Sequence, residues 1–265
     1  MSAASQAADD GYHSGMSRAR PLPSLCLILF SVAAACKTAA PPPAASPAAT
    51  PVARVAAALP ESIRWVTNSA EYIAATLQAY RAATSRVEQE GAKRPAGTWA
   101  VVLDADDTII SNVRYQSERA AQGLGYTTES WNAWVKRREA TPIAGAAAFL
   151  ARTREIGGRI AVVTNRLGSE CADTIAVFRA HALAFDAMLC RPDGTPSDKN
   201  PRFEAVARGM TPAGSTPLEV VAFVGDNILD FPQLSQSARA QPDQALRDFG
   251  VRFFVIPNPM YGSWQ

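Results

Sequence analysis

The sequence predicts an α/β fold with a central parallel sheet flanked by helices. Three apolar stretches, 101–103, 159–165 and 220–227, are rich in β-branched residues and have the length of buried strands. Helical patterns separate them, and strands that alternate with helices form parallel sheets with right-handed crossovers. The 265 residues, 48% of them hydrophobic, supply the core of one large domain or two small ones.

The first 36 residues have the pattern of an export signal. Two arginines precede the apolar run 25–32, which is too short to span a membrane and ends in small residues. Met16 stands just before the arginines, so we expect translation to start there rather than at Met1. Cys36 follows three small residues, as in a lipoprotein processing site, and acyl chains on it would anchor the protein to a membrane. Plain cleavage after Ala35, which leaves an unmodified secreted protein, is the alternative.

The segment 37–60 is rich in Ala, Pro, Ser and Thr, and it predicts an extended tether before a folded body at 61–265. Lys37, rather than an aspartate, follows the candidate lipidation cysteine, which favours an outer-membrane, periplasmic or cell-surface location. The body contains Cys171 and Cys190. An exported setting permits a disulfide between them, but two cysteines near different elements of an α/β core are as often buried thiols.

Helical spacing predicts one long helix over 60–89, before the first strand. Residues 112–141 form a polar insertion with several aromatic side chains, which we interpret as a small, mostly helical cap with Thr128 or Ser130 as a helix cap. The later elements are an Ala-rich helix from Pro142 to about Gly157, a helix over 172–181, a weak strand at 187–189, a short helix from Pro201 and a last strand at 251–256.

Polar side chains follow the predicted strands. Asp104 and Asp106 end the first strand, and on an extended backbone they lie on one side about 6.5–7 Å apart. Because close carboxylates repel, one of the two must take up a proton or share a cation. The later strand ends and loops add Thr164, Lys199, Asp226 and Asp230. Since parallel strands place their carboxyl ends at one sheet edge, this set suits a magnesium ion and a phosphoryl group.

Each of these residues also has a structural interpretation. The first aspartate pair could cap the end of a strand, and Asp226 after a glycine could belong to a turn. Thr164 alone would be an ordinary strand residue, Lys199 alone a solvated lysine, and Asp230 a helix cap. Their order along the chain favours the catalytic interpretation.

In that order, Asp104-x-Asp106-x-Thr108, Thr164, Lys199 and Gly225-Asp226-Asn227-x-x-Asp230 resemble the four motifs of the haloacid dehalogenase (HAD) superfamily of phosphotransferases. Trp131-x-x-Trp134, the stretch 162–166 and the C-terminal 257–264 look like the class C acid phosphatases, the outer-membrane lipoprotein 5′-nucleotidase group. The resemblance covers residues 61–265. It implies a HAD-like Rossmannoid fold and a magnesium-dependent acid phosphatase.

The resemblance implies a role for each motif residue. Asp104 would be the nucleophile that forms an aspartyl-phosphate, and Asp106 the general acid and then the base. Thr164 would hold a phosphoryl oxygen, and Lys199 would offset negative charge. Magnesium would bind the Asp104 carboxylate, the Asp106 carbonyl and Asp226, with Asp230 as an indirect ligand.

Two departures from the family pattern are visible. Asp107 stands where the family more often has Glu, which we expect to be a solvent-side change without effect on the mechanism. The surroundings of Lys199 also hold fewer basic residues than we expect for the family.

The substrate is expected to be a small phosphomonoester, with nucleoside monophosphates favoured. By resemblance, Trp131 and Tyr261 would sandwich a base, with Tyr115 behind them and Asn165 among the substrate-binding residues. For Trp134 core packing is the better interpretation. The short insertion predicts an open site.

Other functions are possible. Phosphotransfer to an acceptor would use the same fold, and a non-enzymatic haem-binding or adhesive lipoprotein is a different class. A bis-His haem site within one chain is excluded, because His181 is the single histidine of the mature part. The net charge of +2 does not indicate a nucleic-acid polymer as partner. Oligomeric state is left open.

Overall fold

The computed structural model describes residues 58–209 and 216–265. The expected export signal, Cys36 and all but the end of the tether lie outside the described residues. Within the described part, no helix is both long and apolar enough to cross a membrane.

A five-stranded parallel sheet forms the centre of the domain, as predicted, in the order β5-β4-β1-β6-β7. Its strands are β1 (Trp99–Leu103), β4 (Arg159–Leu167), β5 (Ala187–Arg191), β6 (Glu219–Gly225) and β7 (Phe253–Val255). All five residues of β1 are buried, because it lies in the middle of the sheet and is covered on both faces. A separate two-stranded ribbon consists of β2 (Ile110–Ser111) and β3 (Thr141–Pro142).

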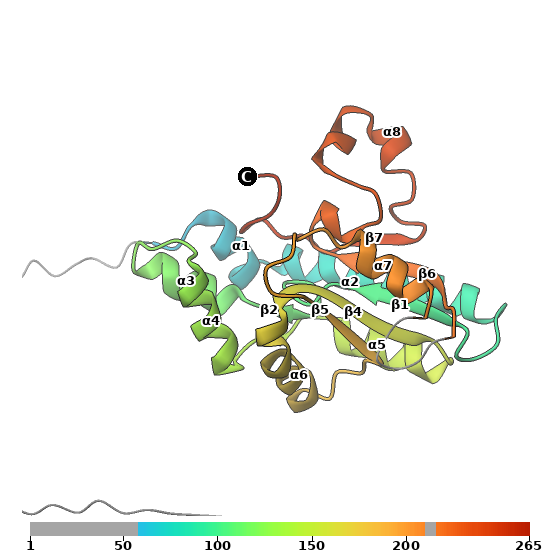
Figure 1. Cartoon of the computed structure of the whole chain (residues 1–265). Coiled ribbons are helices and arrows are strands. Elements are labelled where there is room, and N and C mark those ends of the chain that lie inside the picture. The colour runs from blue at the N-terminus through green and yellow to red at the C-terminus, as the bar shows by residue number, and fades with distance from the viewer. Residues whose placement is uncertain (1–57, 210–215) are drawn as a thin grey trace, which may run out of the picture. The chain divides into compact units, whose positions relative to one another are not determined.

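Two apolar clusters cover the two faces of the sheet, and alternate residues of β1 belong to each. Val101 and Leu103 pack in the larger cluster, with α2 (Ala70–Gly91), α5 (Ala146–Glu155) and α6 (Cys171–Ala180). Ala100 and Val102 pack in the smaller one, with α7 (Asn200–Ala207) and several phenylalanines. Figure 1 shows α5 and α6 on one side of the strands and α7 on the other. The two-residue repeat of a strand produces this division.

The expected helix over 60–89 is two helices, α1 (Glu61–Asn68) and α2, so that prediction was wrong at one point. Ser69 separates them in an extended conformation, and its hydroxyl accepts a hydrogen bond from the Tyr72 N–H at 3.1 Å. A serine in this conformation is a favourable N-cap. The apolar spacing on both sides of Ser69 is helical, and for this reason the break is not visible in the periodicity.

The Ala-rich helix begins four residues later than predicted. Pro142 pairs with Ile110 in the short ribbon, and α5 starts after Gly145, whose φ is 91°. In the cap, Thr127 rather than Thr128 or Ser130 occupies the N-cap position of α4 (Thr128–Arg137). Its hydroxyl accepts from the Ser130 N–H, and the Ser130 side chain accepts from the N–H of Thr127.

The cap consists of α3 (Val113–Ala121) and α4, which lie together beside α1 in Figure 1. Trp134 is 2% exposed and its ring N–H donates to Asn112, so the expected core packing of this residue is confirmed. Glu118 of α3 accepts from the Arg137 guanidinium of α4 at 2.8 Å. This contact, aided by Arg114 and opposed by burial, lowers the pKa of Glu118 to about 2. The ion pair between α3 and α4 therefore keeps its charges in mildly acidic solution.

Cys171 and Cys190 form a disulfide, so the alternative of buried thiols was wrong. Cys190 lies in β5 opposite Thr164 of β4, while Cys171 begins α6, which follows β4. This crossover brings the two Cα atoms to 6.0 Å, within the range that a disulfide requires.

The remaining elements are short: η1 (Gly168–Glu170), η2 (Ile228–Asp230), η3 (Gln236–Ala240) and α8 (Pro242–Ala245). The last strand has three residues rather than the six expected. Gly250 has a φ of 77°, and residues 251 and 252 belong to a turn before β7.

Candidate active site

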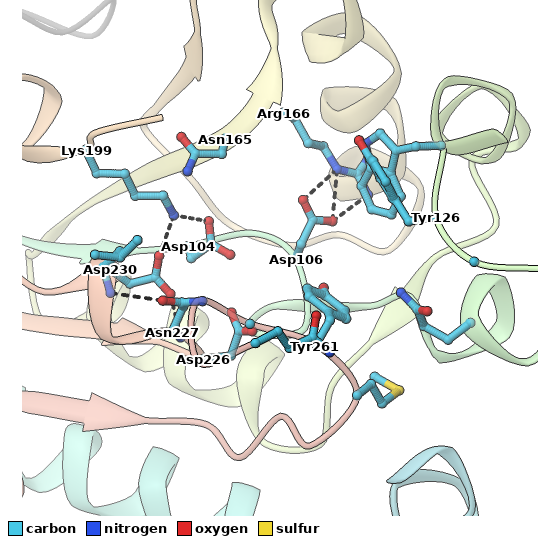
Figure 2. A pocket seen from close by; sticks show the side chains of 17 residues that line it. Asp104, Asp106, Tyr126, Asn165, Arg166, Lys199, Asp226, Asn227, Asp230 and Tyr261 are labelled. Carbon is cyan, nitrogen blue, oxygen red and sulfur yellow. Dashed lines mark hydrogen bonds and ion pairs between the residues drawn. The ribbon is translucent and has the colours of Figure 1, made fainter. Parts of the chain in front are cut away.

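A pocket of about 660 Å³ opens at the carboxyl edge of the sheet. Its polar lining includes Asp104, Asp106, Asn165, Arg166, Lys199, Asp226 and Asp230. Its outer lining includes Tyr126, Trp131, Leu229, Met260 and Tyr261. Figure 2 shows the carboxylates of Asp104, Asp226 and Asp230 close together, while that of Asp106 points toward Arg166. The structure therefore brings most of the predicted site residues together.

Lys199 lies between two carboxylates at the base of the pocket. Its Nζ donates to Asp104 and, at 2.7 Å, to Asp230, and all three residues are at most 7% exposed. Although burial opposes the charged form, the two carboxylates raise the pKa of Lys199. The lysine that sequence order singled out therefore carries a positive charge beside the proposed nucleophile.

Asp104, Asp226 and Asp230 each present a carboxylate oxygen within 4.8 Å of the other two. With Lys199 the group sums to −3 + 1 = −2, which matches a divalent cation. Oxygen donors of this kind suit a hard ion such as magnesium. The position of Asp230 close to the strand end requires a glycine at 225, because a Cβ there would lie 2.2 Å from the Cβ of Asp230.

Electrostatics support the same conclusion. Burial raises the pKa of Asp104 to about 7, with Asp230 and Asp106 adding to the rise and Lys199 opposing it. Burial, followed by repulsion from Asp230 and Asp104, raises the pKa of Asp226 well above its usual value. These carboxylates repel in the absence of a cation, and a bound one would relieve the repulsion.

Asp230 has a structural role as well. Its Oδ2 accepts from the N–H of Asn227 at 2.9 Å, while Oδ1 accepts from Lys199. It belongs to the 3₁₀ turn η2 and caps the start of that turn, at Asn227. Asp230 therefore caps a turn, as one interpretation of the sequence held, and also lines the pocket.

Asp106 is held by Arg166, a residue to which sequence reasoning gave no role. Asp106 Oδ1 accepts from Arg166 Nη2 at 2.8 Å, from Arg166 Nε at 3.0 Å and from Asn112 Nδ2 at 2.8 Å. Its Oδ2 accepts only from Arg166 Nε, at 3.1 Å, among the described residues. The signal that could have identified Arg166 is its position at the end of a strand, two residues after Thr164.

The expectation for Asp107 was wrong, because this side chain is 1% exposed rather than on the solvent side. It accepts hydrogen bonds from the Tyr261 hydroxyl and from the Asn112 N–H. Burial raises the pKa of Asp107 to about 6, although both hydrogen bonds oppose the rise. Asp107 therefore supports the site from behind, by holding the ring of Tyr261 at the pocket wall.

The C-terminal segment closes one side of the site. Asn258 donates from Nδ2 to Asp226 at 2.8 Å, and Ser263 donates to the side chain of Asn227 at 2.7 Å. Sequence reasoning gave neither residue a role. Since both contacts bridge more than 30 residues, no local pattern reveals them.

The aromatic residues occupy different depths. Trp131 lines the pocket, with the Arg166 guanidinium 5.4 Å from its ring centre. Tyr115 packs edge-on against Trp131, with ring centres 5.3 Å apart, and lies behind it as expected, away from the lining. Tyr126, to which sequence reasoning gave no role, also lines the pocket and is 64% exposed.

Thr164 and Asn165, at the end of β4, are placed differently. The Thr164 hydroxyl is buried, accepts from the Arg166 N–H at 3.1 Å and does not line the pocket. Its expected contact with a phosphoryl oxygen stays a prediction. Asn165 lines the pocket, and its Oδ1 accepts from Arg202 at 2.6 Å.

A parallel sheet that carries an aspartate pair, a buried lysine and a second aspartate pair at its carboxyl edge defines a phosphatase of the HAD type. Residues 27–264 match the family model of the HAD superfamily, subfamily IIIB (acid phosphatase), and the chain belongs to this family. The protein is therefore a phosphomonoesterase, which confirms the fold class and the enzyme class predicted from sequence.

Solved structures support this assignment. The chain is similar to a class C acid phosphatase from Bacillus anthracis with tungstate bound, at 27% identity and a TM-score of 0.68. The match covers 77% of this chain and 84% of the other. A second structure of the class C acid phosphatase from the same organism matches at 27% identity with a TM-score of 0.67 and the same coverage.

Proposed function

We propose that the protein hydrolyses phosphomonoesters, nucleoside monophosphates among them, with magnesium and through an aspartyl-phosphate on Asp104. The observation that carries this proposal is the position of Asp104, which lines the pocket with one oxygen on Lys199 and lies beside Asp226 and Asp230. The Lys199 ammonium beside this carboxylate would stabilise negative charge on the phosphoryl oxygens during the attack.

Two steps follow from this geometry. The Asp104 carboxylate attacks phosphorus, the ester P–O bond breaks, and the leaving oxygen takes a proton from Asp106. A water molecule then attacks the aspartyl-phosphate and gives a proton to Asp106, and phosphate leaves. Among the described residues, Asp106 Oδ1 accepts three hydrogen bonds and Oδ2 one, so Oδ2 is the oxygen suited to carry this proton.

Magnesium would be held by Asp104 and Asp226, with the Asp106 carbonyl and, indirectly, Asp230. When bound, it would supply positive charge to the phosphoryl oxygens. Asn258 would orient Asp226, because it donates to the Asp226 oxygen Oδ2.

A panel of phosphomonoesters tests the metal requirement. We expect hydrolysis to stop after treatment with EDTA and to return when excess magnesium is added, because Lys199 alone compensates only part of the charge of the three close carboxylates. Calcium serves as the control, since its larger size and flexible coordination suit the site less well. Activity that is unchanged in EDTA would contradict a metal-dependent mechanism.

The outer pocket supports an aromatic leaving group. Trp131, Tyr126 and Tyr261 line its wall. A base that stacks on an aromatic side chain gains about 1–3 kcal/mol, nearly independent of its identity. This wall therefore favours nucleoside monophosphates of broad base composition.

Trp131→Ala should raise the KM for nucleoside monophosphates about tenfold or more, because a stacking surface is lost. The KM for glycerol phosphate, which has no ring to stack, should change little. Steady-state kinetics with both substrates make this comparison, and the matched control is Trp264→Ala, a ring that is 55% exposed and outside the pocket lining. Equal effects on both substrates would overturn the stacking role.

We also propose that the protein is exported and anchored through acyl chains on Cys36. The disulfide between Cys171 and Cys190 supports an oxidising compartment. Mass spectrometry of the native protein should show cleavage before Cys36 and an acylated amino terminus. An unmodified Cys36 would contradict the lipid anchor.

A further inference from the structure

Arg202, on the first turn of α7, is a second cation beside the phosphate-binding groups. Its Nη1 donates to the carbonyl oxygen of Thr164, and its Nη2 donates to Asn165 Oδ1 at 2.6 Å. Longer contacts reach the carbonyls of Ser197 and Asp198, at 3.5 and 3.3 Å. All four acceptors are uncharged.

The Arg202 charge has no carboxylate partner among residues 58–209 and 216–265, although Arg208, directly after the same helix, pairs with Glu204. Charged side chains are rarely removed from solvent unless they form an ion pair. The Arg202 guanidinium instead donates to neutral oxygens at the end of β4 and in the loop before α7. Arg202 does not itself line the pocket, so its effect on a bound anion would act through the residues that it holds.

The contact with Asn165 decides which way that amide points. A guanidinium can only donate, so the atom of Asn165 that it contacts must be the oxygen. The amide nitrogen then points to the other side, and Figure 2 shows it on the side of Asn165 that faces Asp104 and Lys199. Since Asn165 lines the pocket, its two N–H groups are presented toward the space where a phosphoryl group would lie. A flipped amide would present oxygen to an anion, which repels it.

We propose that Arg202 is a positioning residue for phosphate binding, which fixes the Asn165 amide with its N–H groups toward the phosphoryl oxygens. The same guanidinium holds the end of β4 against the start of α7, where Lys199 lies. It thereby sets the distance between the amide donor and the ammonium donor of the site. This inference rests on the proposed function, in which the pocket that Asn165 lines binds a phosphoryl group.

A double-mutant cycle tests this inference in the full-length enzyme. The variants are Arg202→Met, Asn165→Ala and the combination, and the readouts are the inhibition constant of inorganic phosphate, kcat and thermal unfolding. Arg202→Met should weaken phosphate about tenfold, in line with the loss of a hydrogen bond from a charged donor. In the Asn165→Ala background the same change should have less than about a twofold effect, because its target is absent.

A purely structural clamp between β4 and α7 predicts a different result, in which Arg202→Met has the same effect with or without Asn165. That outcome would overturn the inference. Arg202→Lys keeps the charge but cannot hold two acceptors as a fork does, so full recovery of phosphate affinity in this variant would also overturn it. The matched control is Arg208→Met, on the exposed end of α7, which should leave phosphate affinity unchanged.

Asn165→Asp keeps the experiment decisive if Arg202→Met does not fold. The new carboxylate pairs with Arg202 and places an oxygen where the amide N–H groups were, so phosphate should bind more weakly than in Asn165→Ala while the melting temperature is kept. Wild-type affinity in Asn165→Asp would overturn the amide orientation. An Asp104→Asn protein separates the two proposals: if it loses activity while the Arg202 cycle shows no coupling, the mechanism stands and only this inference fails.

Discussion

An Asp104→Asn protein is expected to fold normally and to lose at least about a thousandfold of its kcat, since removal of a nucleophile costs this much or more. The amide has the size of the carboxylate but lacks the charge needed to attack phosphorus. The fold should survive because Lys199 keeps its contact with Asp230 at 2.7 Å. Steady-state kinetics and circular dichroism check both halves of this prediction.

Asp243→Asn is the matched control, because Asp243 is an exposed aspartate on α8, outside the pocket lining. Its kcat should equal that of the wild type. An acid quench during turnover of radiolabelled substrate adds an independent test, since label should remain on the wild-type protein and be absent from the Asp104→Asn protein. Full activity in the variant would refute the assignment of Asp104 as nucleophile.

Lys199→Met should both unfold more easily and lose activity. The Lys199 side chain is 3% exposed and contacts the carboxylates of Asp104 and Asp230, which are also buried. Removal of one member of a buried ion-pair group leaves uncompensated charge and costs about 3–5 kcal/mol in the free energy of unfolding. Activity falls as well, because Asp104 and the phosphoryl group lose the cation beside them.

Urea unfolding of both proteins measures this loss, and Lys136→Met is the control because Lys136 is exposed on α4. The control removes the same charge and should change the free energy of unfolding by less than about 0.5 kcal/mol. If Lys199→Met were as stable as the control, the lysine would not be compensating the buried carboxylates.

The sheet and the order of its elements could be predicted from sequence because their determinants are local. β1, β4 and β6 are apolar runs whose burial follows from composition alone, and β6 is followed directly by Asp226. In a parallel sheet, residues at strand ends share one edge whatever the loops do. Asp104, Asp106 and Asp226 could therefore be expected at one edge without any knowledge of contacts, and all three line the pocket.

Helix boundaries were harder, because they depend on single hydrogen bonds rather than on periodicity. Ser69 interrupts a pattern that remains helical on both sides, and Pro142 pairs in a ribbon instead of starting a helix. The burial of Asp107 was also misjudged, because it depends on a tyrosine 154 residues away that returns to cover it.

The partners of the site residues are what the tertiary structure decided. Arg166 meets Asp106 across 60 residues, Arg202 meets Asn165 across 37, and Asn258 meets Asp226 across 32. A side chain at such a separation leaves no local pattern, because its position is set by how strands and helices pack against one another. The sequence therefore determined which polar groups meet at the carboxyl edge of the sheet, through their places at or after the strand ends. Packing determined which groups hold them, because only the folded chain brings a guanidinium or an amide within hydrogen-bonding distance.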